Sequence, residues 1–201
     1  MSLLKRVLLG LMAVVFASGI AAGAFAVYKE AEEDVFISAI RHGGYVLYLR
    51  HAQRYKGPPD NLFPDSPPAA FADCTHQRNL TPYGVDQAAL LGEYFRRLDI
   101  KLDRVIANPS CRTRGTAMLA FGRATLEPRM MVPAFIRDQL GVAPAPGTNT
   151  VLVGGENPLR QIVGFEIEPA EIAIFKPDGE GGATLVGRLK LDDWIDGWFD
   201  R

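Results

Sequence analysis

Short apolar runs alternate with amphipathic segments along most of the chain. Three apolar runs predict buried strands: residues 45–49, 103–107 and 150–153. Each is followed by a predicted helix: residues 82–98, residues 112–121, and a short helix capped by Asn157. Thr81 before Pro82 is typical of a helix start, since a hydroxyl caps the first turn and proline lacks only an N–H that has no partner there. This alternation predicts an α/β fold with a parallel sheet.

Near the C-terminus the pattern changes to strands alone. Residues 171–175 and 183–189 flank a Pro-Asp-Gly-Glu-Gly-Gly turn, which predicts a β-hairpin. We therefore predict a three-layer α/β/α sandwich, with a mostly parallel sheet and an antiparallel C-terminal hairpin, formed by one domain over residues 34–201. The proline-rich stretches 53–73 and 123–149 are expected to be irregular loops.

The first 28 residues form a separate segment. Lys5 and Arg6 precede an apolar run from Val7 to Tyr28, which contains an Ala-x-Ala site at residues 24–26. This order predicts a signal peptide, and the run is also long enough for a membrane anchor. A buried helix of a soluble protein is the alternative. Residues 1–28 are therefore predicted to export the domain to the periplasm or to the extracytoplasmic face of the membrane.

Export changes the interpretation of the two cysteines, Cys74 and Cys111. In an oxidising compartment an even number of cysteines permits a disulfide. Two separate buried thiols are the alternative.

The charged residues exclude one class of function. The chain has 22 Lys and Arg against 23 Asp and Glu, so its net charge of −1 offers no polybasic surface for nucleic acid. Histidine, cysteine and carboxylate residues show no metal-site spacing. Neither a metal nor a cofactor is predicted.

Polar residues gather where the predicted strands end. Arg50-His51, residues 108–112 and residues 154–157 follow the three strands. Ligands bind at the carboxyl ends of strands in open α/β sheets, so we expect these segments to form one site. A second pair, Arg41-His42, ends a helix before the first strand and would lie at the opposite edge of the sheet. Contact between a basic residue and the C-terminus of a helix explains that pair without a functional role.

Three motifs resemble those of the histidine phosphatase superfamily, also called phosphoglycerate-mutase-like. They are "LRHA" at 49–52, "LTPYGVDQAALLGEYF" from Leu80 and "VIANPSCRTRGTA" from Val105. The resemblance extends from about Asp34 to Trp194, and the C-terminal part looks like exported or membrane-anchored members. It implies the phosphoglycerate-mutase-like fold and hydrolysis of a phosphomonoester without a cofactor.

The resemblance also assigns roles to individual residues. His51 would be the nucleophile that forms a phosphohistidine. Arg50 and Arg112 would bind the phosphoryl oxygens, because a guanidinium matches them in bidentate geometry. Arg78 either rims the pocket or is an ordinary solvated arginine. The expected ligand is a small phosphorylated molecule.

After the third strand the chain departs from the family pattern. The family has a second histidine there, whose ring contacts the phosphoryl oxygens. In an ungapped alignment Gly155 stands at this position, and a deletion of the histidine would give almost the same sequence. Glu156 is a general acid, a solvent-facing turn residue, or part of a Gly155-Glu156 pair that repels anions and marks a site without catalysis. His76 is a candidate replacement for the missing histidine. We predict a phosphohydrolase of low activity acting through His51. The alternatives are a catalytically impaired pseudo-phosphatase that binds a phosphorylated ligand and a structural domain of the cell envelope.

Overall fold

The computed structural model describes residues 35–191, so the predicted signal peptide or anchor at residues 1–28 lies outside the described residues. Residues 35–37 belong to an N-terminal unit, and the unit that begins at Ser38 contains the whole sheet. Within residues 35–191 we find no helix with the length and apolarity needed to cross a bilayer. The same residues include no group of three or more His, Cys, Asp or Glu side chains placed to hold a metal ion.

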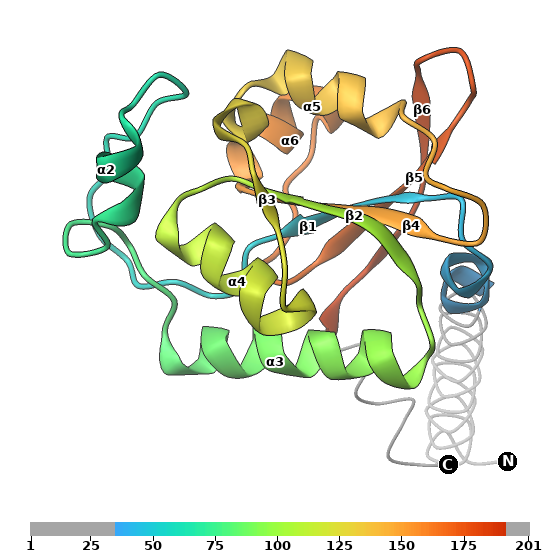
Figure 1. Cartoon of the computed structure of the whole chain (residues 1–201), viewed down its shortest axis with the longest axis horizontal. Coiled ribbons are helices and arrows are strands. Elements are labelled where there is room, and N and C mark those ends of the chain that lie inside the picture. Colours follow the sequence, from blue (N-terminus) through green and yellow to red (C-terminus); the bar gives the residue numbers. More distant parts are fainter. Residues whose placement is uncertain (1–34, 192–201) are drawn as a thin grey trace, which may run out of the picture. The chain divides into compact units, whose positions relative to one another are not determined.

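The unit from Ser38 onward is built on a six-stranded sheet with the order β3-β2-β4-β1-β5-β6 (Figure 1). Its strands are β1 (Val46–Arg50), β2 (Leu102–Ala107), β3 (Thr125–Leu126), β4 (Asn149–Gly154), β5 (Ile172–Pro177) and β6 (Ala183–Leu189). Strands β1 to β4 pair in parallel, whereas β5 lies antiparallel to both β1 and β6. The predicted mostly parallel sheet with an antiparallel C-terminal hairpin is confirmed.

Helices cover both faces of this sheet (Figure 1). On one face lie α3 (Pro82–Arg97) and α4 (Cys111–Phe121), and on the other lie α5 (Pro133–Leu140) and α6 (Glu156–Val163). Helix α3 begins as the sequence predicted, with the Thr81 hydroxyl accepting a hydrogen bond from the Gly84 N–H at 3.0 Å. The three-layer α/β/α sandwich is confirmed.

Both segments expected to be loops contain regular structure. Residues 53–73 include α2 (Pro68–Ala72), and residues 123–149 include β3, a 3₁₀ helix at Pro128–Met131 and α5. Helix α5 forms because its proline occupies the first position, while Ile136 and Leu140, four residues apart, are buried on one side. In these segments the prolines start helices instead of preventing them.

The predicted start of the last helix was also wrong. Gly155, rather than Asn157, precedes the first residue of α6. Pro158 fits inside the first turn because the N–H groups there have no acceptor within the helix.

The helix before β1 ends at His42. Gly43 and Gly44 follow with φ of +81° and +91°, the left-handed conformation that closes helices and favours glycine. His42 is exposed, and its Nδ1 lies 2.7 Å from the Ser38 carbonyl oxygen of the same helix. Arg41 and His42 therefore lie at the opposite end of β1 from Arg50 and His51.

Candidate active site

Strand β1 delivers Arg50 and His51 to the edge of the sheet where β2 and β4 also end. The preceding residues 46–49 have no exposed surface, since β4 and β5 flank β1 on either side. The parallel pairing of β1 with β4 places Arg50 opposite Gly154. The three strand ends meet around a cavity of about 290 Å³. Its lining includes residues from all three segments: Arg50, His51, Asn108, Ser110, Arg112, Gly155 and Glu156.

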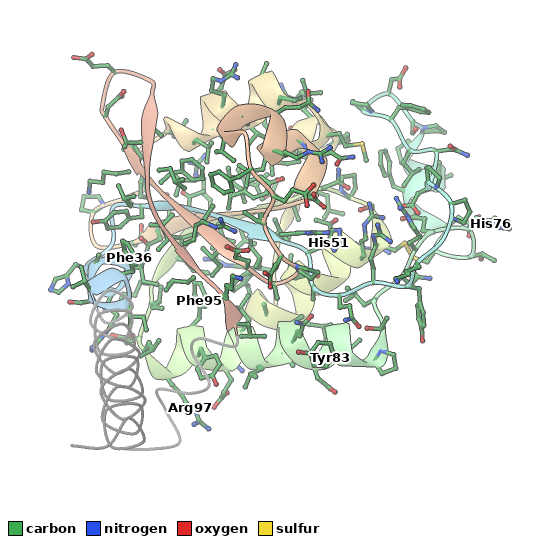
Figure 2. The ribbon with its side chains drawn as sticks, turned by 180° about the vertical axis from the view of Figure 1, so that it is seen from behind. Phe36, His51, His76, Tyr83, Phe95 and Arg97 are labelled. Carbon is green, nitrogen blue, oxygen red and sulfur yellow. A yellow bond between two sulfur atoms is a disulfide. The ribbon has the colours of Figure 1, made fainter. Side chains whose placement is uncertain are left out.

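His51 is buried at the end of β1, with 4% of its surface exposed (Figure 2). Its Nδ1 lies 2.8 Å from the Ala52 carbonyl oxygen, which can only accept, so Nδ1 carries the ring proton. Burial, together with the positive charge of Arg112, lowers the pKa of His51 from 6.5 to about 3. The imidazole is therefore neutral at physiological pH, and Nε2 holds a free electron pair.

The two arginines beside His51 each have one buried nitrogen without a hydrogen-bond partner. Arg50 pairs with Glu156 at 2.9 Å and contacts the Ile167 carbonyl oxygen. Arg112 pairs with Asp60. Among the described residues, Arg50 Nε and Arg112 Nε are the buried side-chain nitrogen and oxygen atoms that lack a hydrogen-bond partner. A buried N–H group without an acceptor costs free energy. Both arginines also line the cavity.

Asp60 is a site residue that the sequence did not reveal. Its carboxylate, 5% exposed, accepts hydrogen bonds from the backbone N–H and Nε of Arg78, both at 2.9 Å, and pairs with Arg112. Burial opposes ionisation, but the hydrogen bonds from Arg78 and the charge of Arg112 hold the pKa of Asp60 below its usual value. Arg78 therefore lines the cavity as a paired residue. Arg54 adds a fourth guanidinium to the lining.

Solved structures show the same arrangement of strands and helices. No protein-family model matches the chain, and no curated protein matches its sequence. The structure of the protein histidine phosphatase SixA complexed with tungstate superposes with a TM-score of 0.52 at 15% identity, covering 75% of this chain and 99% of that one. A phosphoserine phosphatase from Entamoeba histolytica gives 0.48 at 12% identity, over 73% of this chain and 96% of that one. This is the histidine phosphatase fold.

At Gly155, where the sequence resemblance predicts that a histidine is missing, the fold leaves room for a Cβ atom. Gly155 has an ordinary φ of −88°, and a Cβ built on it would meet only the Pro158 ring, at 3.9 Å. Its carbonyl oxygen accepts a hydrogen bond from the buried Tyr48 hydroxyl at 2.7 Å. A Cβ on the preceding residue, Gly154, would instead overlap that hydroxyl. The two adjacent glycines therefore differ: one is required by packing, and the other is not.

The structure separates the two other candidates for a catalytic role. Glu156 begins α6 and lines the cavity, and its side chain is 21% exposed and paired with Arg50. The alternative of a solvent-facing turn residue is therefore wrong. His76 is exposed and lies outside the cavity lining. Figure 2 shows it on the outer edge of the segment around α2, well apart from His51, so it does not replace the missing histidine.

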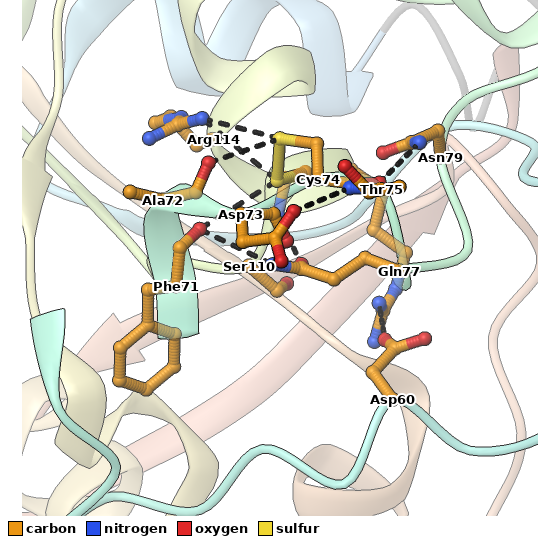
Figure 3. The surroundings of a disulfide bond; sticks show 12 residues. Asp60, Phe71, Ala72, Asp73, Cys74, Thr75, Gln77, Asn79, Ser110 and Arg114 are labelled. Atoms are coloured by element: carbon orange, nitrogen blue, oxygen red, sulfur yellow. Dashed lines mark hydrogen bonds and ion pairs between the residues drawn. A yellow bond between two sulfur atoms is a disulfide. The ribbon is translucent and has the colours of Figure 1, made fainter. Parts of the chain in front are cut away.

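A disulfide fixes one wall of the site. It joins Cys74 to Cys111 with their Cα atoms 5.8 Å apart (Figure 3). Cys111 is the first residue of α4 and directly precedes Arg112. Gln77 strengthens the junction, because its Oε1 accepts a hydrogen bond from the Cys111 N–H at 2.8 Å. The segment that follows α2 is thereby held against the helix end that carries the phosphate-binding candidate Arg112.

Proposed function

We propose that this chain is a phosphohydrolase that cleaves phosphomonoesters through a phosphohistidine at His51. The supporting observation is that the guanidinium groups of Arg50 and Arg112 line one cavity together with the neutral imidazole of His51. A phosphoryl group supplies oxygen acceptors and a negative charge for these donors. The fold, shared with SixA, is consistent with this chemistry.

The hydrogen bond from Nδ1 of His51 to the Ala52 carbonyl oxygen leaves Nε2 as the ring nitrogen that can react. The Nε2 electron pair of His51 attacks phosphorus, the bond to the ester oxygen breaks, and the alcohol leaves as its oxygen takes a proton from water. Glu156, the general-acid candidate, could donate this proton only if its pair with Arg50 opened. The ring then carries a positive charge, which the Ala52 carbonyl stabilises through Nδ1–H. Water next attacks phosphorus, the N–P bond breaks, and inorganic phosphate is released. Arg50 and Arg112 stabilise the charge on the phosphoryl oxygens in both steps.

We expect slow turnover, because Gly155 provides no side-chain donor. Losing one preorganised donor typically costs on the order of 10²–10³ in rate. The same observation favours a second candidate function, a pseudo-phosphatase that binds a phosphorylated ligand without hydrolysing it. The disulfide between Cys74 and Cys111 supports a further part of the proposal, that the domain works outside the cytoplasm.

The test measures hydrolysis of p-nitrophenyl phosphate by the purified full chain and by four variants. We expect His51→Ala to abolish turnover, and His42→Ala, a histidine outside the cavity, to leave it unchanged. Gly155→His should raise kcat at least about tenfold, because a Cβ fits at this position and the ring would restore a donor. Gly155→Ala fills the same position without a donor and should give no gain.

Each outcome separates the candidate functions. Turnover that survives His51→Ala would overturn the phosphohistidine mechanism. A wild type without turnover that binds vanadate, together with gain in Gly155→His, would establish the pseudo-phosphatase. The absence of both turnover and vanadate binding would leave the structural domain.

A further inference from the structure

A second cavity, of about 200 Å³, adjoins the first. The two share five lining residues: Leu62, Arg78, Ser110, Arg112 and Met131. Beyond these, the second cavity is lined by residues 59–61 and Phe63, all from the loop before α2. We call this second cavity the side cavity. Because the two cavities share these residues, the side cavity lies next to the place where a phosphoryl group would meet the arginines.

We propose that the side cavity binds the alcohol part of the substrate, and that this part is an uncharged aromatic group. The inference rests on the proposed phosphomonoesterase function. Leu62, Phe63 and Met131 give the side cavity an apolar wall, and Phe63 is 59% exposed. An aromatic ring gains from stacking on phenylalanine and from contact with a methionine sulfur.

The loop holds these apolar side chains in place before a ligand arrives. Asp60 is anchored by its bonds to Arg78 and Arg112, so the chain starts from a fixed point. Asn61 follows with φ of +50°, a left-handed conformation that asparagine tolerates better than most residues. Phe63 and Ser66 then close a turn, with the Phe63 N–H donating to the Ser66 hydroxyl at 2.9 Å. Such a preorganised wall binds a ring without first having to be ordered.

Charge argues for an uncharged alcohol. Asp60 lines the side cavity but not the larger one, so a carboxylate stands where the alcohol would sit. A second anionic group, such as the carboxylate of a phosphorylated hydroxy acid, would be repelled there. Arg78 and Arg112 are already paired with that carboxylate, which reduces their attraction for a second anion.

The test compares two non-hydrolysable ligands by titration calorimetry on the full chain. Phenylphosphonate and methylphosphonate carry the same anion, but only the first has a ring. We expect phenylphosphonate to bind about five- to tenfold more tightly. Phe63→Ala should remove most of this preference and leave the methylphosphonate affinity unchanged. Tyr55→Ala is the matched control, because Tyr55 is an exposed aromatic residue on the same stretch of chain that lines neither cavity.

The outcomes distinguish the two proposals. Equal affinities for the two phosphonates in the wild type would overturn the side cavity's role while leaving the phosphate site intact. An equal loss of both affinities in Phe63→Ala would also overturn it, since the residue would then act on the fold. If neither phosphonate nor vanadate binds, the proposed function fails and this inference fails with it.

Discussion

The buried neutral state of His51 should make the fold sensitive to acid. In the unfolded chain the imidazole titrates with its ordinary pKa of 6.5, whereas in the fold burial and then Arg112 lower the pKa to about 3. At a pH between these two pKa values, the imidazole is protonated in the unfolded state and neutral in the folded state. The free energy of unfolding should therefore decrease as the pH falls below about 6.5 and level off near 3.

The size of this effect follows from the two pKa values. Each pH unit between them is worth about 1.36 kcal/mol. Lowering the pH from 7 to 4.5 should therefore cost about 2.5 kcal/mol through this one residue, because the pH then falls about two units below the unfolded pKa. This is a large part of the stability of an ordinary domain, which is about 5–15 kcal/mol.

The assay is urea unfolding of the wild type and of His51→Gln at both pH values. Other titrating groups contribute nearly equally to the two proteins, so the change with pH in their stability difference isolates His51. The structural cost of the substitution is present at both pH values and cancels as well. We expect the wild type to lose about 2.5 kcal/mol more than the variant. A difference between wild type and variant that stays constant with pH would refute a neutral, desolvated His51.

Three further predictions concern the surroundings of the imidazole. Gly154→Ala should lower Tm, because the added methyl group would overlap a buried tyrosine hydroxyl, whereas Gly155→Ala should leave Tm within about 2 °C in the same thermal scan; equal Tm values would contradict this. Serine in place of both Cys74 and Cys111 should reduce the free energy of unfolding in urea by about 3–4 kcal/mol, given the separation of 37 residues, and an unchanged midpoint would argue against the crosslink. Arg112→Lys keeps the charge but loses the planar fork, so we expect kcat/KM for p-nitrophenyl phosphate to fall about tenfold or more; an unchanged value would exclude a role in phosphate binding.

The pattern of the chain could predict where the site lies, because parallel strands bring their carboxyl ends to one edge. Arg50-His51, Arg112 and Gly155 each follow a strand, and the structure gathers them around one cavity. Local signals also predicted α3, where Thr81 and Pro82 set the first turn. Periodicity and capping are properties of neighbouring residues, so they are readable without tertiary information.

The contribution of the long loop could not be predicted in the same way. Asp60 lies in a proline-rich stretch with no periodicity, and its importance comes from contacts with Arg78 and Arg112, far along the chain. The helix α5 was missed for a related reason, since prolines were interpreted as breakers although Pro133 occupies a first helical position. Such pairings depend on how a loop folds over the domain, and no local pattern encodes that.

The link between Cys74 and Cys111 has a practical consequence for anyone who produces this protein. It ties the segment after α2 to the helix end that carries Arg112, so the position of this candidate phosphate-binding residue depends on its formation. A preparation made in a reducing cytosol would lack this tie. An inactive sample from such a source could be mistaken for a protein that has lost its catalytic residues, although only the disulfide would be missing. Activity should therefore be assayed on protein expressed under oxidising conditions before a lack of turnover is attributed to Gly155.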